Sequence, residues 1–367
     1  MKTVAATLSQ LGKDFEIEDV VLDDPRAGEA LVEVFASGIC HTDAVAQHGG
    51  LPFPVPGVLG HEGVGRVLAV GEGVTSCKPG DNVLMTWPSC GSCRNCKAGN
   101  PRFCLDLIPM ILAGGRADGS TAIKRTDGSA LGSHFFGQSS FARHSIVYAS
   151  GLVPFSTDIP VEAVSALSCG IATGAGAIMN AAHVEPGSSI VIYGAGAVGL
   201  SAVMAAALSP ATKIVVVEPN QSRRAKALSY GATDVIDPKT DADVVGLVRE
   251  VCHGPADLAL DCSGHTAVVR QTIDSVGMLG TAMLIGAAPA GATFTADHQS
   301  TLWGKRIVGT LGGESQSTRF IPALLELQGQ GRFPFDELIE YFDFEDINAA
   351  QAASASGDVV KPVLRMS

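Results

Sequence analysis

The pattern of apolar and polar residues changes character near residue 170 of this 367-residue chain. Before that point, short β-rich runs such as 30–35 and 65–70 are bounded by Gly, Pro or Asp, as is typical of strands joined by turns. The first twenty residues indicate a strand, a turn and another strand. Residues 100–140 contain few periodic segments, so we expect a long loop there, and such loops in compact domains are commonly functional. This part of the chain is predicted to be a mainly-β domain.

From about residue 171, short apolar runs alternate with helical periodicity. The predicted strands are 188–193, 213–218, 233–236, 258–261 and 281–285. The predicted helices are 197–208, 221–230 and 241–252. Strands that alternate with helices form βαβ units, in which a parallel sheet is covered on both faces. The pattern fades near residue 310, and the β-like tail at 358–364 is expected to return to the first domain. The predicted fold class is therefore α/β, with a doubly wound parallel sheet beside the mainly-β domain.

Composition supports two folded domains and argues against some partners. Hydrophobic residues make up 46% of the chain and charged residues 17%, which provides buried cores and carries no disorder signature. The formal net charge of −12 argues against a nucleic-acid partner and against binding to an anionic membrane surface. We see neither a signal peptide nor an apolar run with the character of a membrane span, so a cytoplasmic protein is expected.

Gly194, Gly196 and Gly199 form a G-x-G-x-x-G turn between a predicted strand and a predicted helix. In dinucleotide-binding folds these glycines permit the tight turn, the approach of the pyrophosphate and close packing of helix on strand. Glu218 ends the next strand, where an acidic side chain accepts hydrogen bonds from the adenosine ribose. Its charge would repel a 2′-phosphate, which favours NAD over NADP, although Arg223, which we also place at the cofactor, opposes that preference. The alternative is a glycine-rich turn in an unrelated α/β protein.

Four of the nine cysteines form a C-x₂-C-x₂-C-x₇-C segment, and they are Cys90, Cys93, Cys96 and Cys104. Thiolates at this spacing can close a tetrahedral zinc site with no position left for water, which defines a structural metal. The alternatives are free thiols or an iron–sulfur cluster, whose common spacings differ from this one. A zinc-bearing nucleic-acid module is disfavoured because few basic or aromatic residues surround the segment.

Three further candidate ligands, Cys40, His61 and Cys169, each stand among small residues. Two cysteines and one histidine leave the fourth zinc position open for water or substrate, as in a catalytic site. Spacing alone leaves a second interpretation open, because an isolated His or Cys is more often a packed core residue.

Over essentially its full length, the chain resembles the zinc-containing medium-chain alcohol dehydrogenases. The matching segments are GICHTD at 38–43, GHEGVG at 60–65, the four-cysteine segment, CGIATG at 169–174 and GAGAVG at 194–199. The resemblance implies a Rossmann NAD-binding domain at 171–309 and a discontinuous, GroES-like catalytic domain at 1–170 and 310–367. It also implies assembly as a homodimer or homotetramer.

The resemblance assigns a role to each matching residue. Cys40, His61 and Cys169 would bind the catalytic zinc, and Asp43 would fix the tautomer of His61. Glu62 would lie just behind the metal, and Thr42 would hold the alcohol proton. His41 and Lys361 would lie near the pyrophosphate of the cofactor, and Thr173 would contact its nicotinamide. With the structural metal, the enzyme would hold two zinc ions per subunit and pass a hydride reversibly between an alcohol carbon and NAD.

Two segments that are less specific than the zinc motifs resemble bacterial aryl-alcohol dehydrogenases, namely CGIATGAGAIMN at 169–180 and SHFFGQSS at 133–140. The expected substrate is therefore an aromatic or terpenoid primary alcohol such as benzyl alcohol. The residues expected to line its pocket, some of which alternatively only pack the core, are Thr86, Trp87, Ile108 and Leu311.

Two alternative functions remain open. A glutathione-dependent formaldehyde dehydrogenase shares the long loop and both zinc sites, and it needs basic groups such as Arg116 for the glutathione carboxylates. A zinc- and NAD-binding protein without turnover would act as a redox sensor or structural protein, and the intact Cys40, His61 and Cys169 set argues against it.

The chain departs from the family at two positions. Val45 stands three residues after Thr42, where many relatives have a histidine that completes proton release. His48 does not replace it, because six residues on a helix amount to a rotation of about 240°. His41 stands where several relatives have Arg, so we expect NAD affinity to weaken above about pH 7 as the imidazole loses its charge.

Overall fold

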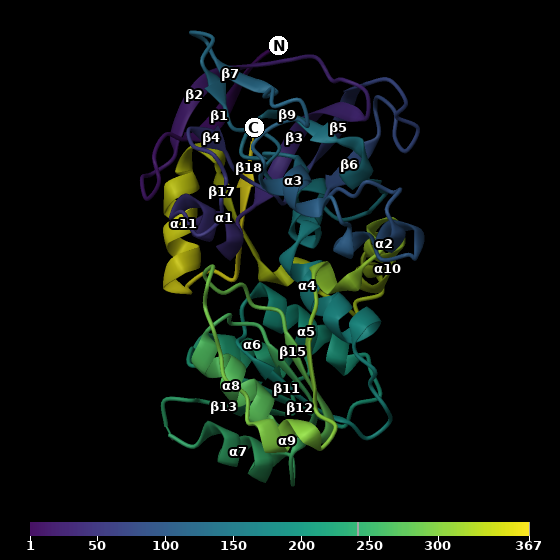
Figure 1. Ribbon diagram of the computed structural model, residues 1–367, viewed down its shortest axis with the longest axis vertical. Coiled ribbons are helices and arrows are strands. Elements are labelled where there is room, and N and C mark those ends of the chain that lie inside the picture. The colour runs from purple at the N-terminus through teal and green to yellow at the C-terminus, as the bar shows by residue number, and fades with distance from the viewer. Residues whose placement is uncertain (241, 367) are drawn as a thin grey trace. The chain divides into compact units, whose positions relative to one another are not determined.

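The computed structural model describes residues 1–240 and 242–366, and the chain divides into two compact units. The first unit comprises Met1–Cys169, Gln316–Gly331 and Phe335–Ser367, and the second comprises Gly170–Ser315 and Arg332–Pro334. Figure 1 labels the helices and strands of both units. Each unit has a hydrophobic core of its own and is described by itself.

Two sheets form the first unit. One has the strand order β4–β1–β2–β7–β8, with bounds Gly57–Val58, Lys2–Leu8, Glu16–Leu22, Ile123–Arg125 and Ala130–Leu131. The other has the order β10–β6–β5–β3–β18–β17, with bounds Leu152–Pro154, Asn82–Met85, Gly63–Val70, Glu29–Gly38, Lys361–Arg365 and Ile339–Asp343, and β9 (His144–Tyr148) also pairs with β3. The predicted strand–turn–strand start is confirmed by the antiparallel pairing of β1 with β2.

The second sheet brings three distant segments to one edge of the first unit. In its register, Ser37 of β3 faces Gly63 of β5, and Gly38 of β3 faces Val363 of β18. Strand β18 therefore belongs to the first unit. Chain segments that enter or leave these strands carry the residues of the candidate active site. The core beneath contains several fully buried aromatic rings, namely Phe135, Phe141 and Phe344.

A six-stranded parallel sheet forms the second unit, which confirms the predicted βαβ pattern. Its order is β13–β12–β11–β14–β15–β16, with bounds Asp234–Ile236, Lys213–Val217, Ser189–Tyr193, Ala256–Asp261, Val276–Leu284 and Arg306–Gly309. The helices α5 (Ala197–Ala207), α6 (Gln221–Ser229) and α8 (Thr266–Ser275) pack on these strands (Figure 1). The order reverses between β11 and β14, and in open α/β sheets ligands bind at such a switch point.

Small residues let two helices of the second unit approach closely. Helix α4 (Gly170–Gly176) packs on α5, and a Cβ added at Gly174 would lie 2.0 Å from the carbonyl oxygen of Val198. A Cβ at Gly176 would likewise meet Gly313 backbone atoms at 2.4 Å. Glycine is therefore required by packing at positions 174 and 176, because any side chain there would force the backbones apart.

Several sequence predictions about elements are wrong. Residues 100–140 are not one loop, because they contain α3 (Leu107–Leu112) and the hairpin β7–β8, whose segments are too short to show periodicity. The tail contains α10 (Ser317–Gly329) and α11 (Ile347–Ser356), and the Ala- and Ser-rich α11 has no wide apolar stripe that would reveal it. Helix α7 (Val244–Val251) begins later than expected, capped by Asp243, and Asp241 lies outside the described residues.

Candidate active site

The first unit brings Cys40, His61, Glu62 and Cys169 together. Their ligand atoms all lie within 4.8 Å of one another. Cys40 stands between β3 and α1 (His41–Gln47), the pair 61–62 directly precedes β5, and Cys169 follows the 3₁₀ helix Val161–Ser168. The pairing of β3 with β5 explains the proximity of Cys40 to the pair 61–62. Sequence analysis predicted this group, and the structure assembles it.

His61 is held so that one ring nitrogen faces the two thiols. The imidazole is fully buried, and its Nδ1 lies 2.9 Å from Oδ1 of the equally buried Asp43. That carboxylate also accepts hydrogen bonds from the backbone N of Cys40 at 3.0 Å and of Gly60 at 3.3 Å. Among the described residues, Nε2 of His61 has no hydrogen-bond partner although it is buried. Since an unpaired buried nitrogen is costly, its position is explained if it binds a metal.

The two thiols have different acidities. A hydrogen bond from Cys169, followed by the influence of His61, holds the pKa of Cys40 well below its ordinary value. The same pair of sulfurs, together with burial, raises the pKa of Cys169 well above its ordinary value. Two cysteine sulfurs and one imidazole nitrogen form the donor set that suits zinc and leave one position for another ligand. The residues therefore fit a catalytic zinc ion.

Glu62 forms a buried ion pair with Lys361, the first residue of β18. Oε2 of Glu62 lies 2.6 Å from Nζ of Lys361, which also donates to the carbonyl oxygen of Ile39 at 3.2 Å. A Cβ at Gly38 would lie 2.1 Å from the same Oε2, so only glycine leaves room for this carboxylate. The ammonium group of Lys361 is buried and directed at Glu62, and its contact with the pyrophosphate stays a prediction. A pyrophosphate contact would require this pair to separate.

Helix α1 places the residues of the predicted proton path. Thr42 is half-buried, and its Oγ1 lies 3.7 Å from Sγ of Cys40. Val45 lies one turn further along the helix and is half-buried against Gly50. His48, at the end of α1, has its Nδ1 2.9 Å from the carbonyl oxygen of Ala44 and is exposed. His41 is exposed at the start of the helix, and its cofactor contact stays a prediction.

The four lobe cysteines also assemble around a common point. The sulfur atoms of Cys90, Cys93, Cys96 and Cys104 lie within 4.8 Å of one another. Backbone N–H groups point at the sulfurs, as for Cys90 N to Cys104 Sγ at 3.3 Å and Cys93 N to Cys90 Sγ at 3.4 Å. Backbone hydrogen bonds near Cys96 and Leu105 lower the pKa of Cys93 to about 6. A thiolate stabilised in this way fits a structural zinc ion.

The residues predicted for the substrate pocket separate into two groups. Thr86 is buried, with its Oγ1 donating to the carbonyl oxygen of Ser168 at 3.1 Å, and Trp87 follows it in the chain. The side chain of Ile108 is 61% exposed on α3, and that of Leu311, in the second unit, is 42% exposed. The structure connects Thr86 and Trp87 to the cysteine–histidine cluster, while the roles of Ile108 and Leu311 stay predictions.

Sequence analysis missed two aromatic rings that surround His61. The rings of Phe136 and His61 have centroids 4.7 Å apart, and Phe135 contacts the same imidazole edge-on at 5.7 Å. Phe136 also contacts Trp87, with centroids 5.2 Å apart. The backbone of Phe136 has a φ of 50°, which non-glycine residues rarely adopt. The SHFFGQSS segment held these residues, but nothing in its pattern indicated the turn that directs them inward.

Gln138 is a second residue that sequence analysis missed. Its buried amide donates to the carbonyl oxygens of His61 at 2.9 Å and Met85 at 3.2 Å, and accepts from the backbone N of Gly63 at 3.0 Å. The segment that carries His61 is therefore fixed on both sides by one side chain.

The glycine turn of the second unit has the geometry of a dinucleotide site. Gly194 has a φ of 94°, and a Cβ at Gly199 would lie 1.9 Å from the carbonyl oxygen of Gly194. Gly196 precedes α5, and a Cβ there would meet no atom within 4 Å, which leaves open space beside the helix N-terminus. Glycine is thus required at two of the positions, and the third leaves room for a bound group. Thr173 is buried in α4 of the same unit.

Glu218 directly follows β12 and contacts this turn. Its Oε2 accepts from the backbone N of Ala195 at 2.7 Å and its Oε1 from that of Asn220 at 2.8 Å. Each carboxylate oxygen keeps a lone pair for a ribose hydroxyl. Arg224 is paired with Asp237 at 2.9 Å, whereas Arg223 is half-buried on α6.

Arg116, the group that a glutathione carboxylate would need, is engaged elsewhere. The guanidinium is buried and donates to both oxygens of Glu29, at 2.7 and 3.0 Å, and to Asp23 at 2.9 Å. His134 Nε2 lies 3.4 Å from the same Glu29. This network connects the 113–134 segment to β3, so Arg116 has a structural role.

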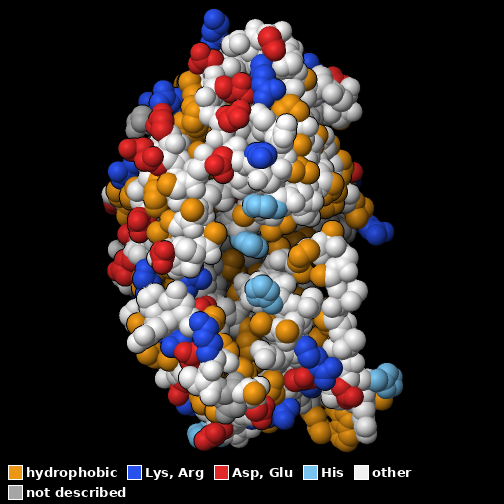
Figure 2. Space-filling model, turned by 90° about the vertical axis from the view of Figure 1, so that its left-hand side faces the viewer, with side chains coloured by type: hydrophobic (Ala, Val, Ile, Leu, Met, Phe, Trp, Pro, Cys, Tyr) orange, Lys and Arg blue, Asp and Glu red, His pale blue; other side chains and the backbone are white. Residues whose placement is uncertain are grey.

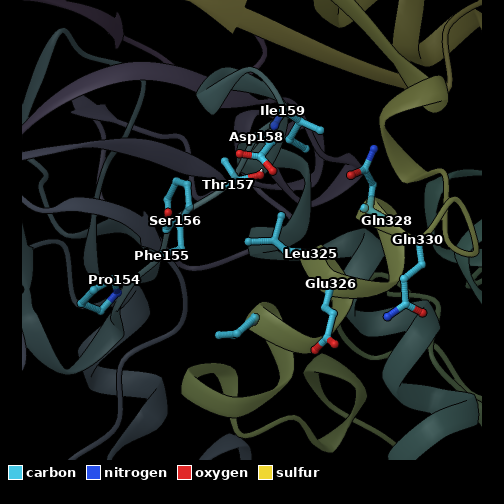
Figure 3. A pocket seen from close by; sticks show the side chains of 12 residues that line it. Pro154, Phe155, Ser156, Thr157, Asp158, Ile159, Leu325, Glu326, Gln328 and Gln330 are labelled. Carbon is cyan, nitrogen blue, oxygen red and sulfur yellow. Dashed lines mark hydrogen bonds between the residues drawn. The ribbon is translucent and has the colours of Figure 1, made fainter.

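A separate cavity of about 580 Å³ lies in the first unit between residues 154–159 and α10. Figure 3 shows Phe155, Asp158, Leu325 and Glu326 among its lining side chains. Its lining contains no residue that sequence analysis assigned to the site, so it is distinct from the cysteine–histidine cluster.

The surface and the helices bear on partners. On the face shown in Figure 2, Lys and Arg side chains are interspersed with Asp and Glu. Among residues 1–240 and 242–366, no single helix has the length and composition to cross a membrane. The bent pair Val161–Ser168 and Gly170–Ala181 meets these two criteria only when its two helices are taken together.

Comparisons with known proteins agree with the fold and the site. Residues 26–156 match the alcohol dehydrogenase GroES-like domain, and residues 197–327 match the zinc-binding dehydrogenase family. Geraniol dehydrogenase of Castellaniella defragrans is 40% identical over 98% of this chain and 96% of its own length. S-(hydroxymethyl)glutathione dehydrogenase of Paracoccus denitrificans is 31% identical over 99% of this chain and 100% of its own.

Solved structures lead to the same class. The crystal structure of benzyl alcohol dehydrogenase from Acinetobacter calcoaceticus matches with a TM-score of 0.96 and 38% identity, covering 100% of both chains. Fold and ligand geometry thus define a zinc-binding dehydrogenase with a GroES-like and a Rossmann part, as predicted. The chain belongs to the zinc-containing medium-chain alcohol dehydrogenase family.

Proposed function

We propose that the protein oxidises an aromatic or allylic primary alcohol to its aldehyde, with NAD as hydride acceptor, and catalyses the reverse reduction. The observation that carries this proposal is the buried Nε2 of His61, which has no hydrogen-bond partner among the described residues and lies beside two cysteine sulfurs. The aromatic rings of Phe136 and Trp87 next to it suit an unsaturated substrate.

The chain supplies the groups that such a reaction needs. Zinc, when bound by Cys40, His61 and Cys169, would lower the pKa of an alcohol hydroxyl, and NAD would accept the hydride from its carbon. Asp43 keeps the proton of His61 on Nδ1, so that Nε2 stays available. Thr42, near Cys40, would accept the hydroxyl proton and pass it on. The products would be the aldehyde, NADH and one proton.

A parallel assay of four alcohols tests the proposal. NADH formation is measured with benzyl alcohol, geraniol, ethanol and S-hydroxymethylglutathione, and the first two are expected to give the highest kcat/KM. The relatives named above act on geraniol and benzyl alcohol, and Arg116 is engaged with Glu29 and Asp23. Preference for S-hydroxymethylglutathione would favour the formaldehyde dehydrogenase alternative, and no turnover of any alcohol would overturn the proposal.

Replacement of Val45 by histidine is expected to change the pH profile of hydride transfer. Val45 occupies the turn of α1 after Thr42, and an imidazole there would add a proton acceptor with an unperturbed pKa of about 6.5. The rate of the hydride step, followed by stopped-flow absorbance between about pH 5.5 and 9, should acquire an inflection in that range. Val45→Leu is the matched control, and identical profiles for all three proteins would contradict the prediction.

Replacement of Glu218 by glutamine is expected to reduce the preference for NAD. The carboxylate charge would repel a 2′-phosphate, whereas the amide oxygen still accepts one backbone hydrogen bond. The ratio of kcat/KM for NAD to that for NADP should fall about tenfold, which corresponds to ~1.4 kcal/mol. Glu250→Gln, an exposed change in the same unit, should leave the ratio unchanged. An unaltered ratio in E218Q would show that another group selects the cofactor.

We further propose that the protein binds two zinc ions per subunit.

We also propose that the protein self-associates through its second unit. Exposed apolar side chains gather around the start of β15 and α9 (His298–Leu302), namely Met278, Leu279, Leu302 and Trp303. The backbone N of Leu279 bonds to the carbonyl oxygen of Trp303, so the two segments are adjacent. Strand β16 pairs with β15 and lies at an edge of the described sheet, where the backbone of another subunit could pair with it. This position and the apolar side chains both favour association.

Met278→Asp is expected to shift the assembly toward monomer. A charge placed in an apolar interface costs several-fold or more in association, because it must be desolvated without a partner. Sedimentation velocity at micromolar protein should show the loss of the larger species, whereas Leu228→Asp on α6 should not produce it. Equal masses for the parent protein and M278D would place the interface elsewhere.

A further inference from the structure

Arg102 belongs by sequence to the four-cysteine lobe, yet its side chain reaches out of it. It lies in the short 3₁₀ turn Pro101–Phe103, two residues before Cys104, and is only 4% exposed. Backbone hydrogen bonds fix this turn, with Cys104 N donating to the carbonyl oxygen of Pro101 at 3.1 Å. The turn therefore fixes the backbone of Arg102 relative to that of Cys104.

The guanidinium of Arg102 contacts the residues beside the candidate active site. Its Nη2 donates to Oγ1 of Thr86 at 3.0 Å, and its Cζ lies 5.5 Å from the centre of the Trp87 ring. It also donates to Oγ of Ser317 at the start of α10. A planar guanidinium makes these contacts in a fixed fork geometry, whereas an ammonium group is a compact point charge on a flexible stem.

Two short routes continue from these contacts to the proposed zinc ligands. Through Thr86, whose Oγ1 donates to the carbonyl oxygen of Ser168, the first route reaches the residue that precedes Cys169. Through Trp87, the second passes to Phe136 and from there to the ring of His61. Both routes lie within the first unit, and their side chains are buried except for that of Trp87, which is partly buried.

We propose that Arg102 is a positioning residue that couples the four-cysteine lobe to the active site, by fixing Thr86 and Trp87 according to the state of the lobe. A guanidinium is expensive to bury, so its placement between the two metal sites is accounted for by this role. The consequence for catalysis rests on the function proposed above, whereas the coupling itself does not. Loosening of Arg102 should enlarge the movement of Trp87 and weaken the binding of bulky alcohols.

Trp87 provides a direct readout, because the chain has two tryptophans and Trp303→Phe leaves only this one. In the full-length, zinc-loaded W303F protein, acrylamide quenching of Trp87 emission is measured with Arg102→Met and Arg102→Lys. R102M should raise the quenching constant at least twofold. R102K should raise it by less, because lysine keeps the positive charge but lacks the forked N–H donors of the guanidinium. Arg94→Met, an exposed arginine of the same lobe, is the matched control and should change nothing.

Coupling is tested by a double-mutant cycle. Cys93→Ser alone should raise the quenching constant of Trp87, but it should add little when Arg102 is already methionine. If R102M does not fold, the same cycle with R102K decides the matter. In steady-state kinetics, R102M should raise KM for benzyl alcohol about tenfold with a smaller change in kcat. Its zinc content should equal that of the parent.

Unchanged quenching in R102M, or effects of C93S and R102M that add, would overturn the coupling. Such a result in an enzyme that oxidises benzyl alcohol would leave the proposed function intact. Conversely, altered Trp87 quenching in a protein that oxidises no alcohol would support the coupling and sink the proposed function.

Discussion

His61→Gln is expected to lower the turnover of alcohol at least about a thousandfold, because the loss of one ligand removes several kcal/mol of stabilisation supplied by the metal. Nε2 of His61 is one of the buried side-chain atoms without a hydrogen-bond partner among the described residues, and Asp43 holds the opposite side of the ring. Initial rates of NADH formation give the activity, and atomic emission gives the zinc content. We expect the content to fall from two ions per subunit to one.

His48→Gln serves as the control for this experiment. His48 is exposed at the end of the helix that carries Thr42, so its replacement should leave both rate and zinc content close to those of the parent. Parental activity or full zinc content in H61Q would contradict the assignment of the catalytic ligands.

Glu29→Gln is expected to destabilise the first unit by about 3 kcal/mol at neutral pH, because the buried Arg116 would lose its principal partner. Burial alone would raise the pKa of Glu29, but the side chains of His134 and Arg116 outweigh it and lower the pKa from 4.5 to about 2. The carboxylate therefore contributes its full stabilisation above about pH 4.5, and that contribution disappears as the pH falls toward 2.

Urea unfolding at pH 7 and at pH 3 measures this effect. The difference in the free energy of unfolding between the parent and E29Q should be largest at pH 7 and should shrink at pH 3. Glu72→Gln, an exposed change on the same unit, should have little effect at either pH. A pH-independent difference for E29Q would show that shape and not charge is responsible.

Local sequence patterns predicted the parts of the site in which spacing or small neighbours carry the signal. The lobe cysteines and the glycine turn each occupy a single short segment, so their geometry is largely decided by local backbone. Cys40, His61 and Cys169 lie far apart in sequence, and only the resemblance to a known family joined them into one group. The parallel sheet was predictable because its strands are buried on both faces and alternate with helices.

Contacts between distant segments were beyond local patterns. Lys361 is 299 residues from Glu62, and nothing near either residue indicates their pairing. The register between β3 and β18 decides this pairing, and no local pattern contains that register. Phe136 was missed for a related reason, since a positive φ at a non-glycine residue depends on tertiary packing that overrides local preference. Gln138 was missed because its partners, His61, Gly63 and Met85, are distant in sequence.

The pairing of β18 with β3 sets an order of events during protein synthesis. The lobe cysteines emerge from the ribosome within one short segment and can collect their metal as soon as it leaves the exit tunnel. The catalytic cluster needs strand β18, because Ile39 N bonds to the carbonyl oxygen of Pro362 and Lys361 supplies the counter-charge for Glu62. Completion of that cluster therefore waits until almost the whole described chain has been made. Until then, a partly translated chain would carry all four lobe cysteines and an unfinished cysteine–histidine cluster.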